Sequence, residues 1–187
     1  IMVAGFTLAG LGSADPTGTD AAVVDGVFGE NKQGLGQAGL ALMIPGLAAL
    51  LWFATGLARY LQASDPDDGL SGAIVPGMAL FAGLVLTGTA VSLSPSIAAS
   101  WTERYTLDVD TARVLGIGGT FIALASGLGA AVVVGCATRI VSRAGLAPPV
   151  VVWIGYAVSA VSLLAGWTYG LGIIAFGGWV LAAAFAL

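Results

Sequence analysis

The residues with the clearest chemical potential form one short acidic turn, Asp65-Pro66-Asp67-Asp68-Gly69. Closely spaced carboxylates ahead of a glycine resemble the first half of a calcium-binding loop between two helices. The full pattern also needs a bidentate glutamate at the twelfth position, and counting from Asp65 that position is Pro76. The calcium pattern therefore fails, and a turn that caps the following helix is the better interpretation.

The other groups that could do chemistry are sparse and poorly spaced. The chain has no histidine and a single cysteine, Cys136, so the usual zinc ligands, haem ligand and general base are missing and no intrachain disulfide can form. Further carboxylates are scattered at spacings unlike those of metal ligands and are expected to form a solvated acidic rim: Asp15, Asp20, Asp25, Glu30, Asp108 and Asp110. We expect a protein that is not an enzyme and has no catalytic, cofactor-binding or metal-binding residues.

Transport chemistry also lacks its usual groups. Proton- and ion-coupled carriers place an ionisable side chain near the middle of the membrane. Here the charged residues fall in polar stretches or at segment ends, and the apolar stretches offer only hydroxyls: Thr55, Thr87, Thr89, Thr120, Ser126, Ser159 and Ser162. Hydroxyls can bond back to their own helix. We therefore expect no coupling of transport to protons.

These residues are embedded in a chain dominated by long uncharged stretches. The chain has 187 residues, of which 58% are hydrophobic and 9% charged, against about 25% charged in soluble domains. A helix needs about 20 apolar residues to cross a bilayer. Four uncharged stretches reach that length: 33–58, 69–102, 114–138 and 144–187. The sequence predicts an all-α, polytopic transmembrane helical bundle, built as a single domain over residues 1–187.

About six membrane helices are expected, the first of them partial. Turn-forming residues and the limits of the uncharged stretches place them at Ile1–Gly12, Gly34–Leu61, Leu70–Ser92, Thr111–Thr138, Pro148–Trp167 and Gly170–Leu187. A polar loop is expected over Ser13–Gln33, with Asn31 as the cap of the second segment. A second loop is expected over Pro95–Asp110, where Trp101 and Tyr105 could share one face of a short interfacial helix.

Two features inside these segments concern packing. A ladder of small residues, which lets a second helix approach closely, runs through the fourth segment: Gly119, Ala123, Gly127, Ala131 and Gly135. This helix-packing interface could face another helix of the chain or another subunit. In the second segment, Pro45 and Gly46 predict a kink or local unwinding, because proline removes a backbone donor and clashes with the carbonyl four residues back.

The charge balance bears on partners and orientation. A net charge of -4 argues against a nucleic-acid surface. The expected partners are the lipid bilayer and other membrane subunits or further copies of the chain. Lysine and arginine counts do not orient a multi-pass chain in the cell membrane, because Arg59, Arg139 and Arg143 on one side balance Lys32, Arg104 and Arg113 on the other. We favour cytoplasmic N- and C-termini, because Arg139 and Arg143 lie in the shorter loop.

The order of these parts resembles a group of actinobacterial polytopic integral membrane proteins. The resemblance rests on Phe53, Leu57, Arg59 and Leu61, then the acidic turn, then a helix of small residues from Ser71, and an arginine-containing turn over Arg143–Trp153. It implies a helical membrane bundle and no particular activity. Together, these features favour a non-catalytic accessory or interaction subunit of a membrane assembly. The alternative is a channel or carrier for a small neutral or lipidic molecule.

Overall fold

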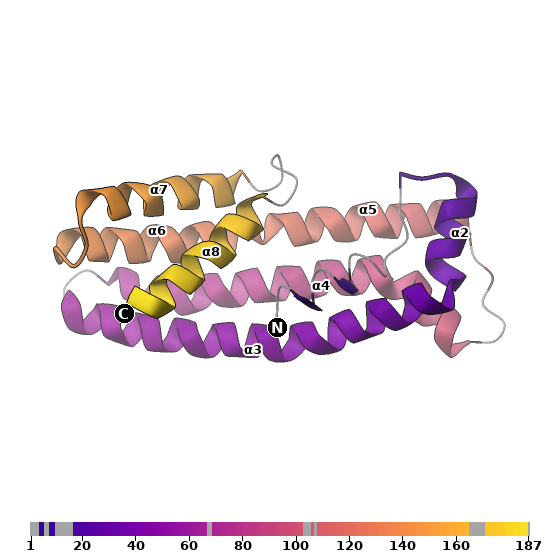
Figure 1. Cartoon of the computed structure of the whole chain (residues 1–187), viewed down its shortest axis with the longest axis horizontal. Helices are drawn as coiled ribbons and strands as arrows, with labels where there is room; N and C mark the ends of the chain where they lie inside the picture. Colours follow the sequence, from indigo (N-terminus) through magenta and orange to yellow (C-terminus); the bar gives the residue numbers. More distant parts are fainter. Residues whose placement is uncertain are drawn as a thin grey trace. The chain divides into compact units, whose positions relative to one another are not determined.

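The computed structural model describes residues 4–5, 8–9, 17–66, 69–102, 106, 108–164 and 171–186, and almost all of them are helical (Figure 1). No strand occurs among them. The helices are α2 (Asp20–Phe28), α3 (Glu30–Ser64), the 3-10 turn η1 (Leu70–Ala73), α4 (Ile74–Trp101), α5 (Val109–Ala125), α6 (Gly127–Arg143), α7 (Pro149–Leu163) and α8 (Leu171–Ala186). The predicted all-α bundle is confirmed.

Three stretches of helix are long and apolar enough to cross a membrane by length and composition: Asn31–Ser64, Leu70–Trp101 and Val109–Arg143. They hold 34, 32 and 35 residues. At 1.5 Å per residue, such helices are roughly 50 Å long, whereas a hydrocarbon core is about 30 Å thick. Each helix is therefore longer than the hydrocarbon core. Its polar ends can extend beyond the core, or the whole helix can tilt to fit within it. Two shorter apolar helices cover Pro149–Leu163 and Ile174–Ala184.

The loop predicted over Ser13–Gln33 is wrong where the structure describes it. Helix α2 begins after Thr19, whose hydroxyl accepts a hydrogen bond from the Ala22 N–H at 3.4 Å, and Asp20 then sits favourably in the first turn. Helix α3 starts at Glu30, so Asn31 is inside the helix and does not cap it. Most of the predicted segment Ile1–Gly12 lies outside the described residues.

The predicted end of the third segment is also wrong, because α4 continues through Pro95 to Trp101. Proline at this position leaves the Val91 carbonyl without its usual backbone donor. The Ser94 hydroxyl donates to that carbonyl at 2.8 Å, which supplies a replacement bond. Trp101 is therefore the last residue of a long helix, and Tyr105 lies outside the described residues.

The fourth predicted segment is divided in two. Helix α5 ends at Ala125 and α6 begins at Gly127, with Ser126 between them. Glycine costs about 1 kcal/mol relative to alanine in a helix interior, so Gly127 weakens the helix at this point. Ser126 keeps right-handed helical torsions (φ -58, ψ -22).

One compact unit contains Ile1–Ala48 and Val85–Ala123. Here α3 packs closely on described residues of the first segment: a β-carbon built on Gly39 would lie 2.7 Å from the Gly5 carbonyl oxygen. At one end of this unit, α3 meets α4 where the Gln37 amide donates to the Ser100 hydroxyl at 3.0 Å. Polar groups therefore tie helix ends together, while the interior is held by close backbone contact.

The second unit contains Ala49–Leu84 and Leu124–Leu187. Helix α6 packs against η1, α7 and α8, and α7 packs against α8 (Figure 1). The Phe81 and Phe176 rings, both fully buried, lie 4.8 Å apart and join α4 to α8. The turn into α7 uses Gly145 at φ +65, which suits glycine, followed by prolines at the helix start.

Pro45 does not interrupt α3. The helix is assigned without a break from Glu30 to Ser64, so the local unwinding expected at Pro45 and Gly46 does not occur. Pro45 is exposed and Gly46 is buried. The bend itself stays a prediction, and the missing donor leaves the Ala41 carbonyl without its usual backbone partner.

Replacing Pro45 with alanine should restore that donor in an already helical position. We expect Pro45→Ala to fold and to raise the free energy of unfolding by about 1–3 kcal/mol, within the cost assigned to proline inside a helix. Thermal unfolding in detergent, followed by circular dichroism, measures the change. A loss of stability would show that Pro45 fixes a bend that the packing requires.

Candidate functional site

Gly119 and Ala123, the first two residues of the small-residue ladder, face α4 of the same chain. A β-carbon built on Gly88 would lie 2.5 Å from both the Gly119 carbonyl oxygen and the Ala123 backbone nitrogen. A β-carbon on Gly119 would in turn lie 2.5 Å from the Gly88 carbonyl oxygen and would meet the Ser92 hydroxyl. Backbone therefore touches backbone here, and any larger side chain would have to push the two helices apart.

Ala131 and Gly135, the last two residues of the ladder, face a different helix, α7. The Ser159 hydroxyl donates to the Ala131 carbonyl at 2.9 Å, and a β-carbon on Gly135 would lie 3.1 Å from the same hydroxyl oxygen. Gly127, the central rung, is buried at the start of α6. Four of the five ladder residues therefore contact other helices of this chain, in two separate packing contacts.

The division of the helix explains why one ladder meets two partners. Gly119 and Ala123 lie on α5, whereas Ala131 and Gly135 lie on α6. Residues four apart are 400° apart around a helix with 3.6 residues per turn, so the second residue of each pair is rotated by only about 40° from the first. Each pair can therefore lie along one neighbouring helix.

Other close contacts were missed by sequence reasoning. A β-carbon on Gly129 would lie 2.5 Å from the Gly77 carbonyl oxygen and from the Phe81 backbone nitrogen, so α6 and α4 also approach closely. Gly155 of α7 meets the buried Thr138 side chain. One signal was available: Gly77 and Gly88 are eleven residues apart, which returns to within about 20° of the same helix face.

Three of the seven hydroxyls predicted to lie in the membrane donate to backbone carbonyls. Ser159 does so as described above, Thr55 donates to Leu51 at 2.9 Å and Thr120 to Gly116 at 2.8 Å, the last two each four residues back. Ser126 differs from the other buried polar side chains of the described residues, because its hydroxyl is fully buried and has no hydrogen-bond partner. It lies midway along the Val109–Arg143 stretch.

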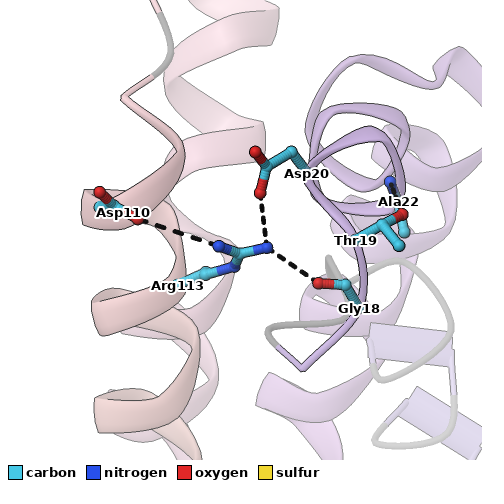
Figure 2. A network of polar contacts seen from close by, with 6 residues as sticks. All are labelled: Gly18, Thr19, Asp20, Ala22, Asp110 and Arg113. Atoms are coloured by element: carbon cyan, nitrogen blue, oxygen red, sulfur yellow. Dashed lines mark hydrogen bonds and ion pairs between the residues drawn. The ribbon is translucent and has the colours of Figure 1, made fainter.

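The acidic residues of the predicted rim are partly paired. Figure 2 shows Arg113 of α5 donating to the Asp20 carboxylate at 2.7 Å and to the Gly18 carbonyl at 2.9 Å, with Asp110 3.9 Å away. Arg113 thereby ties the start of α2 to the start of α5. Asp25 pairs with Lys32 at 2.7 Å. Because the carboxylates are largely exposed, such pairs contribute at most about 1 kcal/mol each.

Asp108 lies just before α5 and accepts a hydrogen bond from the Thr111 hydroxyl, which lowers the pKa of the Asp108 carboxyl below its usual value. Asp15 and the Glu30 side chain lie outside the described residues. In the acidic turn, Asp67 and Asp68 are also outside them, while Asp65 lies 4.0 Å from Arg143. The described residues contain no group of three or more side chains able to hold a metal ion.

No protein-family model, curated protein or solved structure matches this chain. The resemblance to actinobacterial membrane proteins stays a prediction from the sequence.

Two glycines of α4 offer a matched test of the packing. Gly88→Ala places a methyl group against the α5 backbone, so we expect a loss of about 1–3 kcal/mol, the usual cost of overpacking. Gly83→Ala meets nothing within 4 Å, so it should be neutral or stabilise the helix by up to about 1 kcal/mol. Thermal unfolding of both variants in one detergent gives the comparison. Equal effects of the two substitutions would contradict the close approach of α4 and α5.

Proposed function

We propose that this chain is a non-catalytic, multi-pass subunit of the cell membrane that associates with another membrane protein through an open face of α4. The observation that carries the proposal is the distribution of side-chain size around α4. Its buried face holds large residues, including Met78 and Phe81, together with the glycines that touch α5 and α6. The opposite face is exposed and lined mostly by small residues.

The open face is defined by Pro76, Ala79 and Gly83, which lie within about 60° of one another around the axis of α4. All three are exposed, and a β-carbon on Gly83 would meet nothing within 4 Å. Leu80 borders this face. Small residues allow two membrane helices to approach closely, so an exposed row of them favours contact with a further helix over contact with lipid chains.

The placement of charge supports a role without ion coupling. The Leu70–Trp101 stretch has no charged residue, Asn31–Ser64 has none between Lys32 and Arg59, and Val109–Arg143 has none between Arg113 and Arg139. The ionisable groups of these stretches therefore lie close to their ends. A coupled carrier needs such a group at mid-depth.

One observation favours the alternative, a channel or carrier for a small neutral molecule. The buried Ser126 hydroxyl has no partner, and it lies at a break in a membrane-length helix. Discontinuous helices form the substrate sites of many transporters. A single hydroxyl supplies little recognition, so we rank this function second.

For orientation, we propose that Arg59, Arg139 and Arg143 lie on the cytoplasmic side. The count of lysine and arginine is tied between the two sides. Arg139 and Arg143 lie at the end of α6, beside the short connection to α7. Lysine and arginine in short loops have the greatest weight in setting orientation.

The subunit proposal predicts that bulk on the open face of α4 blocks assembly without unfolding the chain. We expect the double variant Ala79→Leu/Gly83→Leu to shift the protein from a larger species to its own mass on native gels of mild-detergent extracts. Val150→Leu, on an exposed position of α7, is the control and should leave the larger species intact. A wild-type protein that runs at its own mass and permeabilises liposomes to small neutral solutes would instead support the alternative.

The orientation predicts which ends of the helices reagents can reach. In a Cys136→Ser background, Thr102→Cys should react with a membrane-impermeant maleimide on intact cells. Ser142→Cys, next to Arg143, should react only after the membrane is opened. Labelling in the reverse order would place the arginines outside the cell.

A further inference from the structure

Helices α7 and α8 are shorter than the three stretches that have the length of a membrane crossing. Helix α7 holds 15 residues and α8 holds 16. At 1.5 Å per residue they are roughly 22 and 24 Å long, against a hydrocarbon core of about 30 Å. Two arrangements fit these lengths. The pair crosses a locally thinned bilayer, or it enters the bilayer and turns back inside it.

Helix α6 gives a scale of depth for its neighbours, because it is one half of the membrane-length stretch Val109–Arg143. The uncharged part of that stretch, residues 114–138, is centred on Ser126. Arg139 is thirteen residues further on, or roughly 20 Å, which exceeds half of the core thickness. In the other half, α5 exposes 65% of Phe121, so it also needs hydrocarbon around it. A bilayer that covers both halves has the start of α6 near its middle.

Helix α7 runs antiparallel to α6 and ends level with its start. A β-carbon on Gly155 would meet the Thr138 side chain. One turn further along α7, the Ser159 hydroxyl donates to the Ala131 carbonyl at 2.9 Å, so the contact has moved toward the start of α6. One more turn brings Leu163, the last residue of α7, level with the first turn of α6.

Helix α8 begins near the same level and returns. Its Phe176 ring lies 4.8 Å from the Phe81 ring, and a β-carbon on Gly129, in the first turn of α6, would lie 2.5 Å from the Phe81 backbone nitrogen. Helix α8 packs against α6 and α7 and runs back toward the turn that joins them (Figure 1). The end of α7 and the first turns of α8 therefore lie close to the start of α6.

The exposed side chains of α7 suit this arrangement. Trp153, near the start of the helix, is 74% exposed, whereas Leu163 and Leu164 at its end are 57% and 53% exposed. Tryptophan is enriched at the level of the headgroups, and leucine favours the hydrocarbon core. The opposing feature is the pair Trp167 and Tyr169, which lie outside the described residues. Helices that cross the bilayer would bring these two aromatic residues to the far surface.

We propose that α7 and α8 form a re-entrant hairpin, which enters and leaves the bilayer on the side of Arg143 and turns near its middle. The register of α7 on α6 carries the proposal, because it stops α7 at the depth of Ser126. The predicted fifth and sixth segments would then each pass through one half of the bilayer. The hairpin does not depend on the subunit proposal, which concerns α4.

The test is the depth of a bimane label at the end of α7. In a Cys136→Ser background, Leu164→Cys carries the label, and the chain is reconstituted in phosphatidylcholine vesicles. Quenching by a nitroxide on the lipid headgroup is compared with quenching by a nitroxide at the end of an acyl chain. The hairpin places the label within about 10 Å of the bilayer centre, so the chain-end nitroxide should quench it more strongly.

Val150→Cys is the matched control, since Val150 is exposed near the start of α7. Its label should lie more than about 15 Å from the centre and show the reverse order of quenching. Leu163→Cys, at the neighbouring exposed position, replaces Leu164→Cys if that variant does not fold. Stronger quenching by the headgroup nitroxide at the end of α7 would overturn the hairpin and show that α7 crosses the bilayer. Neither result alters the expected effect of bulk on α4.

Discussion

The structure depends on the close approach of α4 to its neighbours at glycine positions. Lipid chains are as apolar as leucine side chains, so membrane helices gain little from hydrophobic exclusion and associate mainly through dispersion at short range. At Gly88 against α5, and at Gly129 against α4, there is no room for even a methyl group without displacement of backbone. The exposed face of α4 is what these contacts leave uncovered.

The sequence predicted the fold class because charge depletion and helix length are strong signals in a membrane protein. It also located the small-residue ladder, and four of its rungs touch other helices of the chain. The division at Ser126 was not predicted, and the ladder residues before and after it meet different helices. Gly77, Gly88 and Gly129 were missed because their spacing is not four, although Gly77 and Gly88 share one face of α4.

The errors in element boundaries have local causes that sequence patterns conceal. Pro95 predicted a helix end, but the preceding serine satisfies the carbonyl that proline leaves unpaired. The stretch before α3 predicted a loop because it is polar and rich in glycine, yet Thr19 caps a short helix there. The division at Ser126 has no clear sequence signal beyond a following glycine. Orientation was undecided because lysine and arginine are equally divided between the two predicted sides of the membrane.

The measurement that most directly tests the close approach of α4 is a cysteine cross-link. In a Cys136→Ser background, Gly77→Cys is paired with Val132→Cys, because a β-carbon on Gly77 would lie 3.1 Å from a methyl carbon of Val132, near disulfide reach. Gly83→Cys, on the open face of α4, is paired with Val132→Cys as the control. The account predicts a disulfide under mild oxidation in membranes for the first pair and none for the control. A cross-link at Gly83 without one at Gly77 would place the wrong face of α4 against α6 and contradict it.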